Sequence, residues 1–181
     1  MEPTGFSPWD DNLPMSARRL DGARVADAIR AELLPSVAAF QAKAGRPPAL
    51  SIVLVGDDPA SQVYVRAKEK AGGDVGLAVT VHRLPATAAR QDVLHLVASL
   101  NADDRCDGIL VQAPLPAAMG RDATTEVFDA IDPQKDVDGF HPVNVGLLVQ
   151  GRPTLAPCTP SGVIQLLDRE GIEIAGPPSG L

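Results

Sequence analysis

A tyrosine and a lysine four residues apart are the first pair in this sequence whose types could do chemistry together. Tyr64 and Lys68 lie in the stretch GDDPASQVYVRAKEKAG, directly after an apolar run. A spacing of four residues puts both side chains on one face of a helix, so a ring and an ammonium are presented to the same ligand. The same spacing is typical of a solvated surface pair, and that alternative stays open on the spacing alone.

A glutamine and two aspartates supply polar groups at two other points of the chain. In the stretch DGILVQAPLP, Gln112 stands at the end of the apolar run. The two prolines that follow it prevent a continued ladder or helix. Asp136 and Asp138 share the constrained loop DVDGFHP, where one carboxylate is suited to hold a polar heterocycle. Ligands of parallel α/β sheets bind beyond the carboxyl ends of the strands, so we expect Gln112 to face the same crevice as Lys68. A satisfied strand-end amide and a turn built on aspartate are the alternatives.

The sequence predicts no metal site and no phosphate loop. The Asp136/Asp138 pair departs from the EF-hand pattern, because His141 stands at the sixth position, where that loop requires glycine. The GDD turn lacks the glycine spacing and the Lys-Ser/Thr ending of a phosphate loop, and the chain contains no GxGxxG. The three histidines are widely separated and are expected to have structural or surface roles: His82, His95 and His141.

Apolar runs that alternate with helical patterns predict the elements that position these side chains. Strands are expected at residues 49–55, 77–83 and 108–111, and helices at 21–40, 61–74, 89–100 and 121–131. A last helix is expected to open with Thr159 as N-cap and Pro160 in its first turn, and to run to Gly171. Pro35 is expected to bend or break the first helix. Apolar strands separated by helices indicate an α/β fold with a parallel sheet covered on both faces.

Composition narrows the class of protein. The chain has 181 residues and 45% hydrophobic content, which suits one domain, expected at residues 15–176 behind a disordered extension at residues 1–14. The net charge of -7 disfavours nucleic acid and anionic membranes as partners. No apolar run approaches the ~20 residues of a membrane helix. Cys106 and Cys158 show no CxxC spacing, so we expect a chain without disulfides in the reducing cytoplasm.

Taken together, the motifs resemble those of the bifunctional methylenetetrahydrofolate dehydrogenase/methenyltetrahydrofolate cyclohydrolase family. The resemblance is carried, in the family's order, by LDG near Leu20, VGDDPASQVYVRAKEKA, DGILVQAPLP, PQKDVDGFHPVNVG and PCTPSGVIQLL. It spans residues 20–176. It implies a three-layer catalytic domain with the aminoacid dehydrogenase-like N-terminal fold, which acts on one-carbon tetrahydrofolates in purine biosynthesis.

The resemblance also implies a role for each residue of the site. Lys68 is the central catalytic residue, Gln112 lies against it and tunes it, and Asp138 binds and orients the pterin. Tyr64 stacks against the folate ring system. The full set of substrate-binding residues that the resemblance implies is Tyr64, Val65, Arg66, Ala67, Lys68, Val111, Gln112, Ala113 and Asp138.

The sequence also departs from the family. The family continues into a Rossmann-like domain that binds NADP, and we expect that domain to be absent here, with residues 177–181 as a truncated tail and no cofactor-binding residue in this chain. Much of the family's homodimer contact comes from that domain, so the oligomeric state stays open. An inactive folate-binding fragment and an aggregating truncation are the alternatives. Ala113 replaces the usual leucine, and Gly72 and Gly73 are each expected to weaken the Lys68 helix by ~1 kcal/mol relative to alanine.

Overall fold

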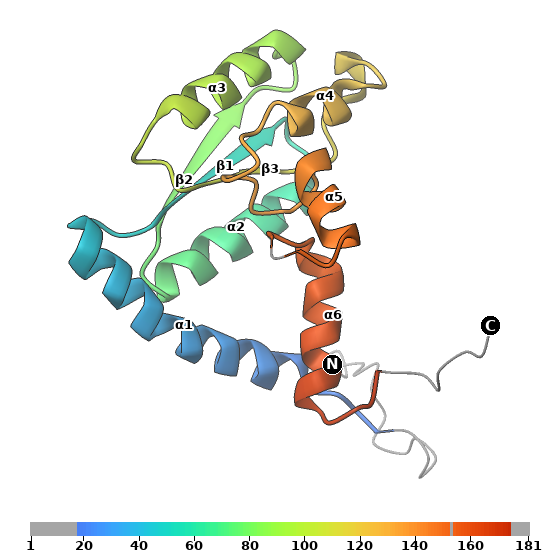
Figure 1. The fold of residues 1–181 in the computed structure, drawn as a ribbon. Helices are drawn as coiled ribbons and strands as arrows, with labels where there is room; N and C mark the ends of the chain where they lie inside the picture. The colour runs from blue at the N-terminus through green and yellow to red at the C-terminus, as the bar shows by residue number, and fades with distance from the viewer. Residues whose placement is uncertain (1–17, 153, 175–181) are drawn as a thin grey trace, which may run out of the picture.

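Three short parallel strands form the centre of the molecule. The structure is a computed structural model that describes residues 18–152 and 154–174, so the predicted extension (1–14) and tail (177–181) lie outside the described residues. The strands are β1 (Ala49–Val55), β2 (Ala78–Leu84) and β3 (Gly108–Val111), in the order β2-β1-β3 (Figure 1). The register pairs Leu50 with Val79 on one side and with Gly108 on the other. The predicted strands are confirmed, with the second displaced by one residue.

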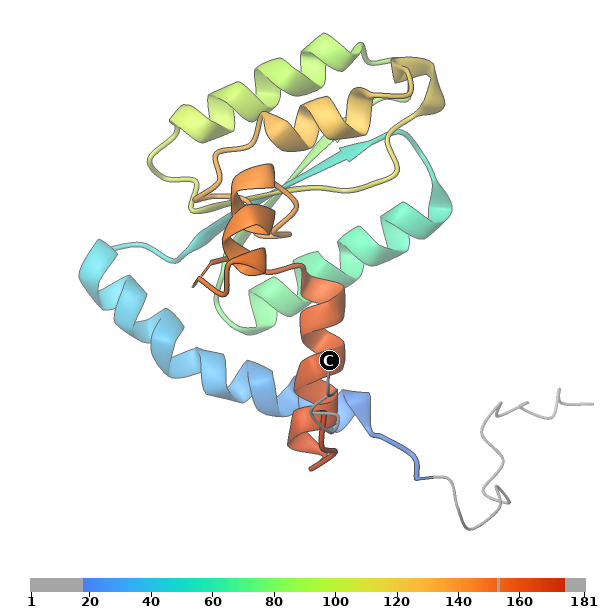
Figure 2. The ribbon, with the colours of Figure 1, turned by 45° about the vertical axis from the view of Figure 1, so that its right-hand side comes forward.

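Helices cover both faces of this sheet. Figures 1 and 2 both show α3 and α4 above one face and α2 beneath the other, with α5 and α6 beyond the edge that carries β3. The expected three-layer α/β architecture is therefore confirmed. The helices are α1 (Gly22–Ala44), α2 (Pro59–Asp74), α3 (Arg90–Ala102), α4 (Ala123–Asp129), α5 (Pro142–Val149) and α6 (Cys158–Arg169), with a 3₁₀ turn, η1 (Ala117–Met119), before α4.

The alternation of side chains along β1 explains the two layers of core. Val53 and Val55 belong to a cluster that includes the buried side chains of α3 and α4. Ile52 and Leu54 point to the opposite face, where they pack with Val65 of α2. Successive residues of a strand point to opposite faces, so an uninterrupted apolar run is what a sheet buried on both sides requires.

The helices differ from the prediction in three places: no break at Pro35, a different start of α6, and one additional helix. α1 runs unbroken through Pro35, because a proline removes only one hydrogen bond and this 23-residue helix is capped at both ends, by Asp21 and by Gly45 at φ +69°. α6 begins at Cys158, so Thr159 is not its N-cap. Pro160 is tolerated in its first turn, where backbone N–H groups have no helical partner. α5 was not predicted, since its apolar sequence PVNVGLLV has no amphipathic period.

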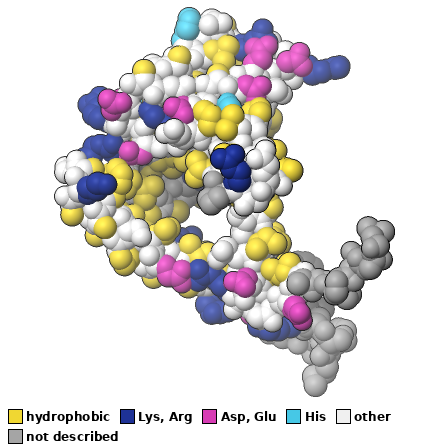
Figure 3. All heavy atoms as spheres, in the orientation of Figure 1, with side chains coloured by type: hydrophobic (Ala, Val, Ile, Leu, Met, Phe, Trp, Pro, Cys, Tyr) yellow, Lys and Arg dark blue, Asp and Glu magenta, His cyan; other side chains and the backbone are white. Residues whose placement is uncertain are grey.

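Ion pairs connect α1 and the residues just before it with the end of α6. The buried carboxylate of Glu170 accepts hydrogen bonds from Arg18 and Arg24, and Arg169 binds Glu32 through two contacts of 2.7 Å. Figure 3 shows a hollow between these two helices and the rest of the molecule, with apolar side chains on its walls. In the part of the chain that the structure describes, no helix is long and apolar enough to cross a membrane.

The two adjacent glycines of α2 do not end the helix, which continues to Asp74. A Cβ on Gly72 would lie 2.5 Å from Cγ2 of Val79 in β2, whereas a Cβ on Gly73 would meet nothing within 4 Å. Gly72 therefore allows α2 to approach the sheet closely, and Gly73 has no such packing reason. The helix cost expected of both glycines stays a prediction, to which the structure adds a packing role for Gly72.

The two glycines should respond oppositely to alanine. Gly72→Ala should lower the free energy of unfolding by ~1–3 kcal/mol, because the stiff Val79 side chain resists overpacking. Gly73→Ala should raise it by ~0.5–1 kcal/mol, because alanine costs less backbone entropy in a helix. Urea denaturation of both variants measures the difference, and two changes of the same sign would contradict this account of the α2–β2 contact.

Candidate functional site

Lys68 and Gln112 meet at the carboxyl edge of the sheet. The Lys68 ammonium donates to Oε1 of Gln112 at 3.2 Å, across 44 positions of sequence. The amide nitrogen of Gln112 donates to the carbonyl of Ala113 at 2.7 Å, which leaves its oxygen facing the lysine. The structure thus brings together two residues that the strand-end rule places in one crevice.

Rigid elements hold this pair. Asp58 caps α2 by accepting from the backbone N–H of Ser61 at 2.7 Å, and Pro59 stands at the first helical position. Val65, with 0% exposure, packs against β1 and β3 and so fixes the rotation of the helix. Gln112 follows β3 directly, and its backbone N–H still donates to Val53 of β1 at 2.9 Å.

The Asp138 loop leaves the sheet as a short extended segment beside β3. The backbone N–H of Ile109 donates to the carbonyl of Lys135 at 2.7 Å, and Ile109 forms a parallel bridge with Asp136. The Lys135 ammonium donates to three carbonyls at the end of α3, those of Leu100, Asn101 and Asp103, at 2.7–3.1 Å. Asp138 therefore follows an unpredicted sheet pairing, which places it at the same edge as Gln112.

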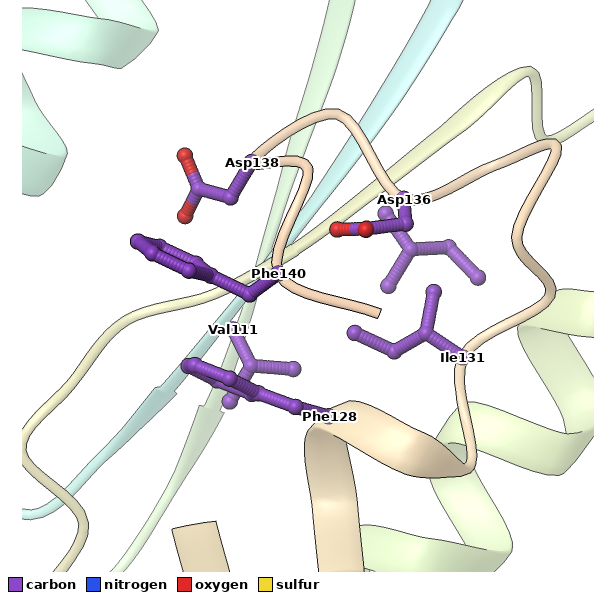
Figure 4. A pocket seen from close by; sticks show the side chains of 7 residues that line it. Val111, Phe128, Ile131, Asp136, Asp138 and Phe140 are labelled. Carbon is purple, nitrogen blue, oxygen red and sulfur yellow. The ribbon is translucent and has the colours of Figure 1, made fainter. Parts of the chain in front are cut away.

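The two acids of this loop have different surroundings. Asp136 is 2% exposed, and its carboxylate accepts from the backbone of Gly139 and His141 and from Nδ2 of Asn144 at 2.8–3.1 Å. Figure 4 shows this carboxylate pointing into the loop, whereas the carboxylate of Asp138 points outward from it. Asp136 is thus a structural acid, and Asp138 is the acid that remains available.

Burial dominates the electrostatics of Asp138. Burial raises the pKa of its carboxyl, the positive charge of Lys68 opposes that rise, and the negative charge of Asp136 adds to it. Burial likewise raises the pKa of the Cys158 thiol, and the charge of Asp138 raises it further. Lys68, Asp138 and Cys158 therefore lie within electrostatic reach of one another.

An aromatic stack lies beneath Asp138. The rings of Phe128 and Phe140 are 5.6 Å apart with an interplanar angle of 12°. Figure 4 shows Phe140 between Asp138 and Phe128, over a small hollow. That hollow is mostly apolar, and it is lined by Ile109, Val111, Phe128, Ile131, Asp136, Asp138 and Phe140.

The remaining residues predicted to bind substrate have mixed positions. Tyr64 is 62% exposed, so its ring is free to stack. Val65 and Val111 are buried in the core, where their side chains hold α2 and β3 in place. Arg66 bonds to Gln62, one turn earlier on the helix surface, instead of joining Lys68 and Gln112. Ala67 and Ala113 are exposed.

Sequence reasoning missed Cys158 as a neighbour of the site and Lys135 as the residue that ties the Asp138 loop to the end of α3. Both lie in motifs that carry the family resemblance, PCTP and PQKD, but nothing in their spacing indicates a contact. The histidines lie elsewhere: His82 bonds to Ser51 and His95 to Gln91, while His141 accepts from the backbone of Val143 at the start of α5. Among the residues that the structure describes, no group of three or more His, Cys, Asp or Glu could hold a metal ion.

NADP, the cofactor that the resemblance implies, does not fit the first strand–helix junction. A pyrophosphate binds where a helix N-terminus offers free N–H groups. Here the carboxylate of Asp58 already takes the N–H of Ser61, and this hydrogen bond holds the pKa of Asp58 below its ordinary value. The negative charge repels phosphate, so the start of α2 offers NADP no binding site.

Comparison with known proteins identifies the family. Residues 20–138 match the model of the tetrahydrofolate dehydrogenase/cyclohydrolase catalytic domain. The bifunctional protein FolD of Rhodopirellula baltica is 54% identical over 165 residues, with 90% of this chain and 55% of that protein covered. FolD of Sorangium cellulosum is 52% identical over 163 residues, with 90% and 56% covered. The chain thus spans about half the length of the curated relatives it matches.

Solved structures agree with this result. The bifunctional FolD of Campylobacter jejuni superposes with a TM-score of 0.80 at 40% identity, covering 86% of this chain and 54% of that one. The Trypanosoma brucei enzyme, solved with NADP cofactor and an inhibitor, gives a TM-score of 0.82 at 38% identity, covering 88% and 54%. With its motifs, its fold and the convergence of Lys68 and Gln112 in agreement, the chain belongs to the tetrahydrofolate dehydrogenase/cyclohydrolase family.

Proposed function

We propose that this chain binds a one-carbon tetrahydrofolate at the carboxyl edge of its sheet and hydrolyses 5,10-methenyltetrahydrofolate to 10-formyltetrahydrofolate. The observation that carries the proposal is the Lys68–Gln112 hydrogen bond of 3.2 Å, beside an outward-pointing Asp138. A proton donor, a group that positions it and a free carboxylate are the set that hydrolysis of a charged heterocycle requires.

Lys68 supplies proton transfer in this reaction. The neutral amine takes a proton from the water that attacks the methenyl carbon. The ammonium formed in this way then gives the proton to the folate nitrogen N5 as the bond between carbon and N5 breaks. The remaining hydroxyl proton leaves to solvent as the C=O bond of the formyl group forms. The amide oxygen of Gln112 faces Nζ throughout, so the lysine nitrogen stays within reach of both the water and the folate.

Asp138 and Tyr64 hold the substrate. A partly buried carboxylate with a raised pKa gains most from donors that bond its charged form, and the N–H groups of a pterin are such donors. The exposed Tyr64 ring, one helical turn before Lys68, offers a flat surface for stacking. The lysine, the ring and the acid come from two elements that the core holds in place.

Folate binding without turnover is the second candidate function. The exposure of Tyr64 favours it, because an exposed ring positions a substrate less tightly than an enclosed one. It differs from the first candidate in one measurable respect: folate binding saturates, but no hydrolysis depends on Lys68.

We further propose that residues 15–176 form one catalytic domain that acts in the cytoplasm and supplies one-carbon units to purine biosynthesis. Two observations support a reducing compartment: the thiols of Cys106 and Cys158 are both free, and Cys158 is exposed beside the site. The oxidation of methylenetetrahydrofolate with NADP and the homodimer belong to the proposal for the longer family members.

Replacement of the central lysine tests the proposed hydrolysis. Lys68→Met should lower the rate of methenyltetrahydrofolate hydrolysis by ~100-fold or more, because it removes the proton-transfer group but keeps an unbranched side chain. Lys70→Met is the matched control, since Lys70 is on the exposed helix surface and pairs with Asp74. Absorbance decay, corrected for spontaneous hydrolysis, gives the rates. Equal rates in wild type and Lys68→Met would refute the lysine assignment, and saturable binding without hydrolysis would favour the second candidate.

The two loop acids should separate stability from binding. Asp136→Asn should lower the free energy of unfolding by ~1–3 kcal/mol. Asparagine has an NH₂ group in place of one carboxylate oxygen, so the N–H donors that face this position lose their acceptor. Asp138→Asn should leave stability unchanged or raise it, since it removes a partly buried charge, but it should weaken folate binding. Urea denaturation and equilibrium folate titration measure the two effects. A similar loss of stability in both variants would contradict this division of roles.

A further inference from the structure

Gly139, directly after Asp138, lies against backbone and has no room for a side chain. Its φ is +68°, in the left-handed region that favours glycine. A Cβ at this position would lie 2.7 Å from the carbonyl carbon of Ala156, 2.9 Å from the nitrogen of Pro157 and 3.0 Å from the oxygen of Leu155. All three are backbone atoms, so no side-chain rotation could relieve the contact.

This contact joins the Asp138 loop to the start of α6. Pro157 is the capping position of α6 and Cys158 is its first residue. On the other side of Asp138, at Val137, the Cys158 thiol donates to the backbone carbonyl at 3.4 Å. The segment before α6 thus touches the loop on both sides of Asp138, and a displacement at Gly139 would move the loop and the thiol apart.

We propose that Gly139 is a positioning residue for the site: its missing side chain lets the loop pack backbone to backbone on residues 155–157. This packing sets the direction of the Asp138 carboxylate and holds the Cys158 thiol beside it. The inference rests on the proposed function only for what Asp138 does to a folate. The geometry itself can be tested without any turnover.

Cys158 is a built-in reporter of this geometry. The chain has two cysteines, and the other one, Cys106, is 5% exposed, so a soluble alkylating agent should reach Cys158 first. The charged groups around the thiol are Asp136 and Asp138 on the loop and Lys68 on α2. Burial and the two acids raise the pKa of the thiol, whereas Lys68 lowers it. Separation of the loop from α6 moves both acids away from the thiol, and the charge of Asp138 is the larger of the two charges that raise its pKa.

The pH dependence of Cys158 alkylation by iodoacetamide tests the contact. In Gly139→Ala the rate profile should move to lower pH, and each unit of movement makes the reaction ~10-fold faster below the pKa. Gly45→Ala is the matched control: Gly45 has a φ of +69° but nothing within 4 Å of its Cβ position, so it shares the strain without the contact. Its alkylation profile should match that of wild type.

A second variant and a double-mutant comparison complete the test. Gly139→Asn keeps the Cβ clash with less backbone strain, because asparagine tolerates the left-handed region. As a single substitution, Gly139→Ala should weaken folate binding at least ~10-fold. Added to Asp138→Asn, it should cause no further loss of binding.

Three outcomes would overturn the inference: an unchanged alkylation profile in Gly139→Ala, an equal shift in Gly45→Ala, or loss of the fold in both Gly139 variants. The last would make Gly139 a general requirement for folding. If the alkylation profile shifts in Gly139→Ala but the wild-type protein does not bind folate, the positioning role stays intact and the proposed function is refuted instead.

Discussion

The candidate site depends on one buried carboxylate, that of Asp136, and on the hydrogen bonds that its oxygens must receive. A carboxylate this deeply buried is costly unless its oxygens are fully hydrogen-bonded, and all three of its donors come from the segments around the site. One of them, Asn144, also donates to the carbonyl of Pro133 and accepts from Thr154. The bonds that compensate the charge therefore tie the loop to α5 and to the approach to α6.

Two acids in one motif consequently have opposite energetic character. Asp136 accepts three hydrogen bonds from the protein and is 2% exposed, so it stabilises the loop and is closed to a ligand. Asp138 is partly desolvated without comparable compensation, and burial raises its pKa. A hydrogen bond from a ligand stabilises a partly desolvated carboxylate of this kind, which is the property expected of a binding residue. The loop thus uses the satisfied acid to hold the unsatisfied one in place.

The exposure of Tyr64 bears on the chemistry proposed for the site. Lys68 and Gln112 are held by a helix and a strand that share a core, but Tyr64 lies exposed beside them. Hydrolysis consumes water, so solvent exposure at Tyr64 does not oppose this reaction. Hydride transfer instead requires a nicotinamide held closely against the folate carbon. The capped N-terminus of α2 offers that cofactor no phosphate site.

The sequence by itself determined the alternating strands and helices, because local periodicity needs no knowledge of distant partners. The geometry of parallel strands further placed Gln112 at the same edge as Lys68, whereas their direct contact was implied only by the family resemblance. Only the tertiary structure decided the rest. It showed that Gly72 makes room for Val79, that Lys135 binds the end of α3 and that Gly139 lies against residues 155–157. These roles depend on burial, close contact and hydrogen-bond satisfaction. Their energies are set by atoms that distant parts of the chain bring together, and spacing along the sequence does not encode them.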